Sequence, residues 1–427
     1  MLIKLNNIAR NAIWMMIEKV VAIFGLFFVT SYVARYIGPA LFGELAFAMA
    51  IFQIVQVTAQ MGSDNIIFKR TAKNVGSGVR LINGSFLLRL GLYVIVSTPI
   101  LFYFYLQPSL ISFLFAFAVC IAYLFSSLDV YAIYNNATLQ SRVNTLSNMT
   151  GLATGLVVRY GIAWFELNPA LLAVPIILTT AIPFIMRYRH FKRNSKAKEL
   201  PVSVRNHAAH RYSHYLLMAG GAVVLSGISV SLYPRMNQFF ISSVLGSYQL
   251  GIYSVALSLA TSWSFVLTSV ITSFYPSIYA EKNNRAALGQ AARLNWLILT
   301  VSGIITLIFF VTGKHLLSFL YGEAFKTAYV PMLILCLGTL FSSLGAVAYR
   351  FIIKYSGYRY LSVKTVFVLV LSLLTSYFLT RHYGLAGASL SFVLVEFFSL
   401  TLLNYFFNNG AILKMHLHTI GLGKWLK

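Results

Sequence analysis

One pattern occurs twice in the sequence, as IGPALFGELAFA at residues 37–48 and as LGSYQLGIYSVA at residues 245–256. With a shift of 208 residues, Gly38 aligns with Gly246 and Gly43 aligns with Gly251. Each copy starts where one apolar run ends and continues into the next apolar run. The repeat therefore indicates a chain made of two similar halves, each containing long apolar segments joined by a short turn.

Twelve apolar runs around this repeat are long enough to cross a bilayer as helices. A hydrocarbon core of about 30 Å needs about 20 residues of α-helix. The predicted spans are 12–34, 40–62, 81–106, 109–131, 145–163, 169–186, 213–233, 251–278, 291–313, 328–349, 361–380 and 384–407. The predicted organisation is an N-terminal six-helix bundle (1–186), a basic cytoplasmic linker (187–212), a C-terminal six-helix bundle (213–407) and a cytoplasmic tail (408–427).

Composition and charge support a membrane protein with both ends on one side. Hydrophobic residues make up 59% of the chain and charged residues only 10%, whereas a soluble domain carries about 25% charged residues. The net charge of +24 would suggest nucleic acid in a soluble protein, but here it lies between apolar runs. The termini and even-numbered connections, counted with Arg293 and Lys364 at the starts of the spans that follow them, carry 25 Lys and Arg, against 5 in the odd-numbered connections. This asymmetry predicts cytoplasmic termini.

Seven ionisable residues are predicted at membrane depth, where charged side chains are costly and commonly functional. They are Glu18, Lys19, Glu44, Arg89, Asp129, Arg159 and Glu396. Two interpretations remain open for this set. The residues form structural ion pairs, or they bind substrate and coupling ions.

The functional interpretation divides the charged candidates by sign. Lys19, Arg89 and Arg159 are candidate substrate-binding residues, since an anionic group would be held by such cations. In the structural alternative, Asp129 pairs with one of the two arginines. The candidates for ion coupling are the carboxylates Glu18, Asp129 and Glu396.

A row of glutamines follows one face of the second predicted span, at Gln53, Gln56 and Gln60. The shift of 208 residues aligns this row with hydroxyl residues in the second half, namely Thr261, Ser264 and Thr268. Polar residues in bilayers commonly form hydrogen bonds between helices. The alternative is a pair of polar faces that bind a hydroxyl-rich ligand, which makes the three glutamines further substrate-binding candidates.

The sequence contains no motif that predicts an enzyme, a cofactor or a metal site. There is no P-loop, no dinucleotide fingerprint and no nucleophile elbow. Cys120 and Cys336 both lie in apolar runs and are interpreted as free buried thiols. Any driving force for transport must therefore come from an ion gradient, the membrane potential or the substrate gradient.

Several segments resemble the Wzx-type polysaccharide flippases of the superfamily that also contains the multidrug antiporters. In the first half they are NAIW at 11–14, VARYIGPALFGELAFAMA at 33–50 and GSDNIIFKR at 62–70. In the second half they are RMNQFFISSVLGSYQLGIYSVALSLA at 235–260, LLSFLYGEAF at 316–325 and YGLAGASLSFV at 383–393. The chain departs from the family at Asn237, where many members have an Asp.

The resemblance implies a fold and a function. The fold would be an all-α membrane protein like the MATE transporters, with two parallel six-helix bundles around a central cavity. The substrate would be an undecaprenyl-diphosphate-linked oligosaccharide, such as an O-antigen repeat unit, moved across a bacterial inner membrane by a transporter rather than an enzyme. Arginine is well suited to bind such a diphosphate. A polysaccharide polymerase and a chain-length regulator are possible protein partners.

Two other functions remain open at this stage. A multidrug or cation antiporter would share the fold and differ in the chemistry of its cavity. A membrane glycan polymerase would need catalytic groups on an outer face, and the short predicted outer connections argue against it.

Overall fold

The computed structural model describes residues 2–195 and 227–421, and of residues 2–26 and 195 it describes the backbone alone. Every regular element in these residues is a helix, and eight helical segments are long and apolar enough to cross a membrane. The chain is therefore a multi-pass α-helical membrane protein, as expected. Its contacts divide it into an N-terminal unit, Met1–Ser231, and a C-terminal unit, Leu232–Lys427.

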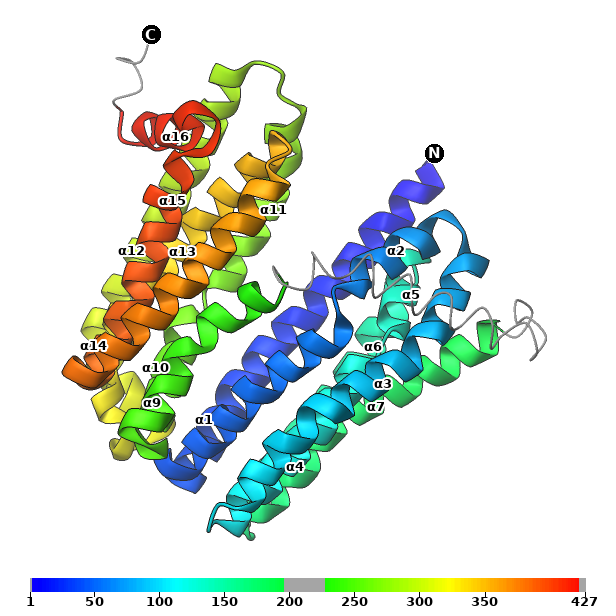
Figure 1. Cartoon of the computed structure of the whole chain (residues 1–427), viewed down its shortest axis with the longest axis vertical. Coiled ribbons are helices and arrows are strands. Elements are labelled where there is room, and N and C mark those ends of the chain that lie inside the picture. The colour runs from blue at the N-terminus through cyan, green and yellow to red at the C-terminus, as the bar shows by residue number, and fades with distance from the viewer. Residues whose placement is uncertain (1, 196–226, 422–427) are drawn as a thin grey trace. The chain divides into compact units, whose positions relative to one another are not determined.

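The repeated glycines make equivalent turns in the two units. Gly38 interrupts α1 (Leu2–Gln60) with φ 73° and ψ 172°. Gly246 lies between α9 (Met236–Leu245) and α10 (Ser247–Thr261) with φ 85° and ψ 173°. Glycine adopts such positive φ values without the steric penalty that a Cβ atom brings. Figure 1 shows that α1 reverses its direction at this turn, so this one element contains both of the first two predicted spans.

The rest of the N-terminal unit follows the predicted order. Its further elements are α2 (Ser63–Lys73), α3 (Val75–Tyr105), α4 (Leu110–Leu128), α5 (Tyr131–Ala137), α6 (Ser141–Trp164), η1 (Pro169–Leu172) and α7 (Ala173–Ser195). The short helices α2 and α5 were predicted as plain connections. They pack on each other at the end of the unit where the N-terminus lies, away from the Gly38 turn (Figure 1).

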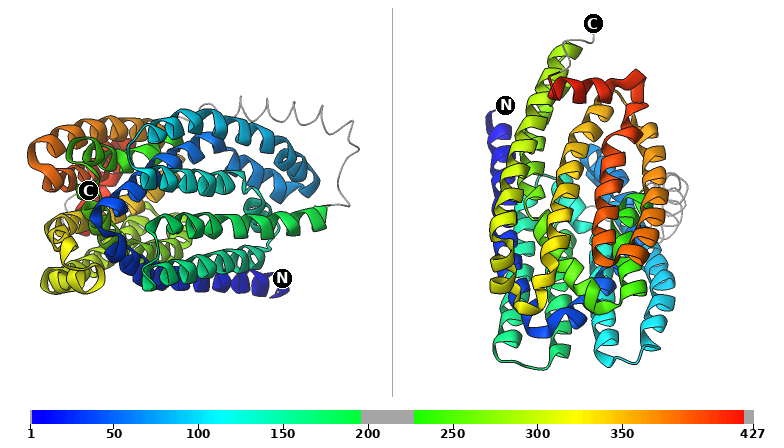
Figure 2. Two further views of the ribbon diagram at one scale, coloured as in Figure 1. Left: turned by 90° about the horizontal axis from the view of Figure 1, so that it is seen from below. Right: turned by 90° about the vertical axis from the view of Figure 1, so that its left-hand side faces the viewer.

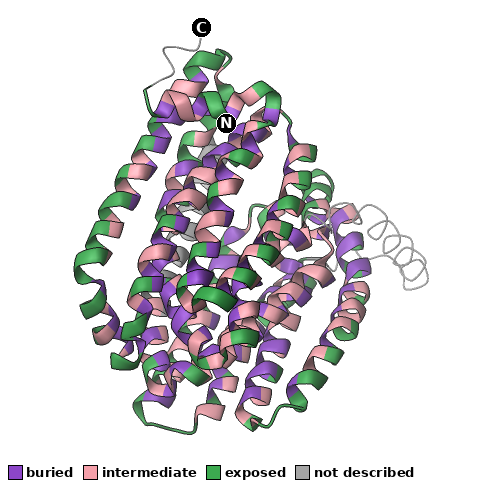
Figure 3. Ribbon diagram, turned by 60° about the vertical axis from the view of Figure 1, so that its left-hand side comes forward, coloured by how far each residue is buried: buried purple, intermediate pink, exposed green. Residues whose placement is uncertain are grey.

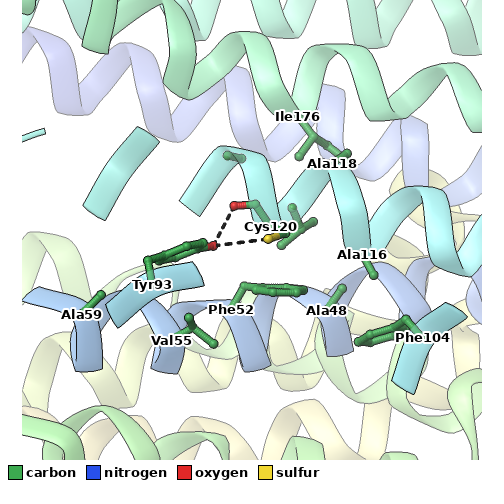
Figure 4. Packing of buried hydrophobic residues seen from close by; sticks show 12 residues of the cluster. Ala48, Phe52, Val55, Ala59, Tyr93, Phe104, Ala116, Ala118, Cys120 and Ile176 are labelled. Atoms are coloured by element: carbon green, nitrogen blue, oxygen red, sulfur yellow. Dashed lines mark hydrogen bonds between the residues drawn. The ribbon is translucent and has the colours of Figure 1, made fainter. Parts of the chain in front are cut away.

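Small residues allow α6 and α7 to approach closely. A Cβ atom at Gly151 would lie 2.5 Å from Pro183 of α7, and one at Gly155 would lie 2.2 Å from Thr179. Two small residues spaced by four are a common means of helix packing in membranes. The same unit has an apolar core in which the Tyr93 hydroxyl donates to the Cys120 carbonyl oxygen at 2.6 Å (Figure 4).

A helical stretch at residues 227–232 contains the boundary between the two units, and the C-terminal unit starts at its last residue, Leu232. It continues through η3 (Tyr233–Arg235), α9, α10, α11 (Ser264–Ala280), α12 (Asn284–Tyr321), η4 (Glu323–Ala328), α13 (Tyr329–Lys354), α14 (Tyr358–Leu400), α15 (Leu402–Tyr405), η5 (Phe407–Gly410) and α16 (Ala411–Thr419). Gly384 interrupts α14 with φ 57°, so α14 contains the last two predicted spans.

The predicted end of the seventh span was wrong. Residues 213–226 lie outside the described residues, but the helical path from residue 227 continues through a 3-10 turn to Leu245. Pro234 and Arg235 suggested a helix end at residue 233. Arg235 instead lies within this helical path and not in an external connection.

The predicted tail contains an ordered helix, α16, whose Ile412, Met415 and Thr419 are buried. The Trp296 indole of α12 donates to the Thr419 carbonyl oxygen at 2.6 Å. Figure 2 shows α16 lying across the ends of the long helices of its unit. Of the predicted linker, residues 187–195 belong to α7, and residues 196–212 lie outside the described residues.

Exposed residues occur all along the helices (Figure 3), and many of them are large and apolar. Phe319 is 78% exposed, Leu87 74% and Val157 72%. A soluble protein rarely exposes so much apolar surface, whereas lipid is a suitable environment for it.

Candidate functional site

Arg89 of α3 is buried in an ion pair with Asp64 of α2. Its side chain is 2% exposed, and Nη2 lies 2.5 Å from Asp64 Oδ1. Nη2 also donates to the Ser63 hydroxyl at 2.6 Å, and Nη1 donates to the Ser127 carbonyl oxygen at 3.0 Å. These contacts join α2, α3 and the end of α4, so in this conformation the guanidinium holds three helices together.

A second ion pair, between Asp129 and Arg187, lies beside the first. Arg187 Nη2 is 2.6 Å from Asp129 Oδ2, and Nη1 donates to the Asn148 amide oxygen at 2.9 Å. The charge of Arg89 also acts on Asp129. We call Asp64, Arg89, Asp129 and Arg187 the N-terminal charge network. The prediction that Asp129 forms its ion pair with Arg89 or Arg159 is wrong, because its partner is Arg187.

The other charged candidates of the N-terminal unit do not join this network. Arg159 of α6 is half-buried, and no ion pair joins it to a described side chain. Glu44 accepts a hydrogen bond from the Ser112 hydroxyl near the start of α4. Glu18 and Lys19 lie in α1, but their side chains are outside the described residues. Substrate binding and ion coupling by the predicted residues of this unit stay predictions.

The predicted polar rows lie on helix faces that are half-buried or exposed. Gln53, Gln56 and Gln60 are all half-buried in α1. The matching hydroxyls in the C-terminal unit, at Thr261, Ser264 and Thr268, donate to carbonyl oxygens of their own helical turn or the one before. Because each oxygen keeps its lone pairs, it can still accept a hydrogen bond from a ligand.

Glu396 is the centre of a polar cluster within the C-terminal unit. The carboxyl is 6% exposed, and Tyr233 donates to its Oε1 at 3.4 Å. The Ser342 hydroxyl is another hydrogen-bond partner, and the ammonium of Lys364 acts on it electrostatically. We call Glu396, Tyr233, Ser342 and Lys364 the Glu396 cluster.

The backbone break at Pro234 positions Tyr233 in this cluster. Tyr233 lies in the 3-10 turn η3, and its carbonyl oxygen accepts a hydrogen bond from Ser372 of α14 at 2.8 Å. On the next turn, Arg235 donates to the Gln238 amide oxygen at 3.0 Å. Asn237 is 3% exposed, and its Oδ1 has no hydrogen-bond partner among the described residues. A buried, partly polar helix break of this kind is suitable for a proton or a cation.

The sequence analysis missed Asp64, Arg187, Arg235 and Lys364. Asp64 and Arg187 follow predicted spans directly, and Arg235 and Lys364 lie within three residues of predicted boundaries. Two features of the sequence could have drawn attention to Asp64 and Arg235. Asp64 is the lone acid in a connection that carries four basic residues. The shift of 208 residues aligns Arg235 with residue 27, in the middle of the first predicted span.

Several solved transporters share this fold. An inward-facing multidrug resistance MATE family transporter of the MOP superfamily has 13% identity, covers 98% of this chain and 99% of its own, and gives a TM-score of 0.64. A MOP superfamily transporter from Pyrococcus furiosus has 13% identity, coverages of 97% and 96%, and a TM-score of 0.61. The lipid II flippase MurJ, in an inward closed conformation, has 14% identity, coverages of 98% and 92%, and a TM-score of 0.58.

These likenesses show that the chain has a multi-pass, MATE-like fold. A family model described as "Polysaccharide biosynthesis protein" matches residues 8–281, which is more than half of the chain. The chain therefore belongs to the polysaccharide biosynthesis protein family. No curated protein matches the sequence.

Proposed function

We propose that this protein is a flippase that moves an undecaprenyl-diphosphate-linked oligosaccharide across a bacterial inner membrane by alternating access. The observation that carries the proposal is family membership in polysaccharide biosynthesis, joined to a fold that a lipid II flippase shares. The O-antigen repeat unit is the proposed substrate. A polysaccharide polymerase and a chain-length regulator are the proposed partners.

The proposed orientation places the N-terminus, α2 and the C-terminus in the cytoplasm. The charge asymmetry of 25 to 5 supports it, and Arg235 lying within a helix leaves only four basic residues on the outer side. A reporter fused within residues 190–205, or at the C-terminus, should stay cytoplasmic. Either reporter outside would overturn this orientation.

The Glu396 cluster is the proposed place for ion coupling. A carboxyl that is 6% exposed and receives hydrogen bonds from Tyr233 and Ser342 can change its charge only when its surroundings compensate. Lys364 supplies a compensating positive charge within the same unit. Proton uptake by Glu396 would remove the negative charge that acts on that ammonium, which gives the unit two electrostatic states.

The decisive experiment is reconstitution of the purified protein in proteoliposomes that contain a synthetic undecaprenyl-diphosphate oligosaccharide. A glycosidase added outside digests only the outer leaflet, so transport appears as digestion of more than half of the substrate. The same vesicles, tested with a cationic fluorescent drug, measure the antiporter activity that is the alternative function. Drug transport without glycan transport would overturn the proposal.

A further inference from the structure

Arg350 lies near the end of α13, beside an exposed face of α11. Its Nη2 donates to the Thr272 hydroxyl at 3.1 Å, and its guanidinium carbon lies 5.2 Å from the centre of the Tyr275 ring. The Tyr275 hydroxyl in turn donates to the Arg350 carbonyl oxygen. The ring and the hydroxyl therefore hold the guanidinium in a fixed place within the C-terminal unit.

This fixed cation has unused hydrogen-bonding capacity. Arg350 Nη1 is buried and has no hydrogen-bond partner in the described part of the chain. No ion pair joins Arg350 to a described Asp or Glu. A guanidinium offers five N–H donors in a planar fork, and leaving a buried charged donor unpaired is costly. The arrangement favours an anionic acceptor with two or more oxygens.

Lys354, one turn further along α13, provides an instructive contrast. Its ammonium donates to the carbonyl oxygens of Ile278 and Glu281, both at 2.8 Å. It thus caps the end of α11. A lysine ammonium has three N–H donors, and two of them are used here, so one is left for a ligand. Of these two neighbouring cations, Arg350 is the one with a buried nitrogen that has no hydrogen-bond partner among the described residues.

Hydroxyl groups surround Arg350 and extend away from it along α11. Thr272 and Thr268 are both exposed, and each hydroxyl donates to a carbonyl oxygen of its own helix, at 2.7 and 2.8 Å. Their oxygens can still accept from sugar hydroxyls. The one proton of the Tyr275 hydroxyl goes to the Arg350 carbonyl oxygen, so the Tyr279 hydroxyl donates to the Tyr275 oxygen, and the Tyr279 oxygen can still accept. The row therefore combines a cation with acceptor oxygens.

We propose that Arg350, held in place by Thr272, binds a phosphate group of the lipid-linked substrate, and that Thr268 and Tyr279 contact the adjoining sugar. This inference rests on the proposed function, and it adds a headgroup site that the sequence analysis had sought at Arg89. A phosphate offers the planar fork two oxygens at once. The same chemistry occurs in phospholipid headgroups, so the test must separate the two sources.

The test uses the full-length protein in nanodiscs of zwitterionic lipid, with farnesyl diphosphate as the soluble probe and farnesol as the probe without phosphate. Arg350→Gln should weaken farnesyl diphosphate binding about tenfold or more, because it removes charge-assisted hydrogen bonds. Arg350→Lys should fall between wild type and Arg350→Gln. Arg359→Gln, which removes an exposed cation from α14, is the matched control and should bind like wild type.

Four results would overturn the proposal. They are wild-type binding by Arg350→Gln, an equal loss in Arg359→Gln, equal binding of farnesol, and loss of probe binding when phosphatidylglycerol replaces zwitterionic lipid. The last result would identify the ligand as bulk phospholipid. If Arg350→Gln does not fold, Thr272→Val serves instead. It removes the hydroxyl that holds Arg350 Nη2, so a severalfold loss of probe binding is expected, and wild-type binding would count against the site.

Failure of this site and failure of the proposed function have different signatures. Normal glycan transport in proteoliposomes together with normal probe binding by the variants would reject the Arg350 site and leave the function intact. Absence of glycan transport by the wild-type protein would reject the function, whatever the probe binding shows.

Discussion

The Arg89–Asp64 ion pair permits a direct choice between a structural and a substrate-binding arginine. We expect Arg89→Met to reduce the amount of folded protein, because it removes three hydrogen bonds from the junction of α2, α3 and α4. We expect Asp64→Asn to have the same effect, since it leaves a guanidinium that is 2% exposed without its counter-charge.

The size of the effect follows from how unequally the two partners are buried. Removing one member of a fully buried pair costs about 3–5 kcal/mol. Asp64 is 42% exposed, so water screens the pair and the estimate falls to about 2–3 kcal/mol for either single variant. The double variant should cost about 1–2 kcal/mol less than the sum of the two, because the second change removes a charge that has already lost its partner.

The assay is membrane abundance of a fluorescent fusion, with the melting temperature in detergent and surface polysaccharide measured on the same cultures. Arg80→Met is the matched control, since Arg80 is exposed on the same helix. If Arg89→Met has normal abundance and melting temperature yet exports no glycan, the structural interpretation is refuted. Arg89 would then be a substrate-binding residue, as the sequence analysis predicted.

Three other predictions concern single positions. Gly246→Ala should lower the melting temperature, because a Cβ at φ 85° costs about 1–2 kcal/mol. Gly91→Ala is the control and should not lower it, because the space around Gly91 is open. Equal melting curves for the two variants would contradict this prediction. Glu396→Gln should flatten the pH dependence of glycan transport in proteoliposomes, and an unchanged pH profile would exclude Glu396 as the coupling group. Burial lowers the pKa of His416 to about 4. The contribution of the neutral imidazole to the stability of α16 should therefore be complete above about pH 6.5 and be lost as the pH falls toward 4. Trp296 fluorescence measures the unfolding of α16, and in His416→Gln it should not depend on pH in this range.

The elements that sequence predicted well are those set by local composition. A run of about 20 apolar residues can satisfy all its backbone hydrogen bonds in lipid by forming a helix. The helices α3, α4, α6 and α13 therefore lie close to their predicted spans. The turn at Gly38 and its repeat at Gly246 were also visible, because positive φ values favour glycine. These features depend on residues that are neighbours in the chain.

The charge pairs were not predicted, because their partners are distant in sequence and close to helix ends. Asp64 and Arg89 are 25 residues apart, and Asp129 and Arg187 are 58 residues apart. Hydropathy gives helix ends only to within a few residues, so Asp64 and Arg187 were assigned to loops. Which acid reaches which base is then decided by how α2 and α7 pack, which no local pattern encodes.

The arginines of the two units differ in whether an acid among the described residues pairs with them. Burying a guanidinium in a helix bundle is costly in either place. At Arg89 the cost is offset by a carboxylate, a hydroxyl and a carbonyl oxygen. At Arg350 a hydroxyl and an aromatic ring fix the side chain but leave Nη1 without an acceptor among the described residues. Each arginine has one buried nitrogen without a partner among the described residues, Nε of Arg89 and Nη1 of Arg350, but only Arg89 is paired with an acid there. We propose the unpaired cation as the one for an anionic ligand, so depth in the membrane, which drew attention to Arg89 in the sequence, is a weaker guide than the absence of a paired acid.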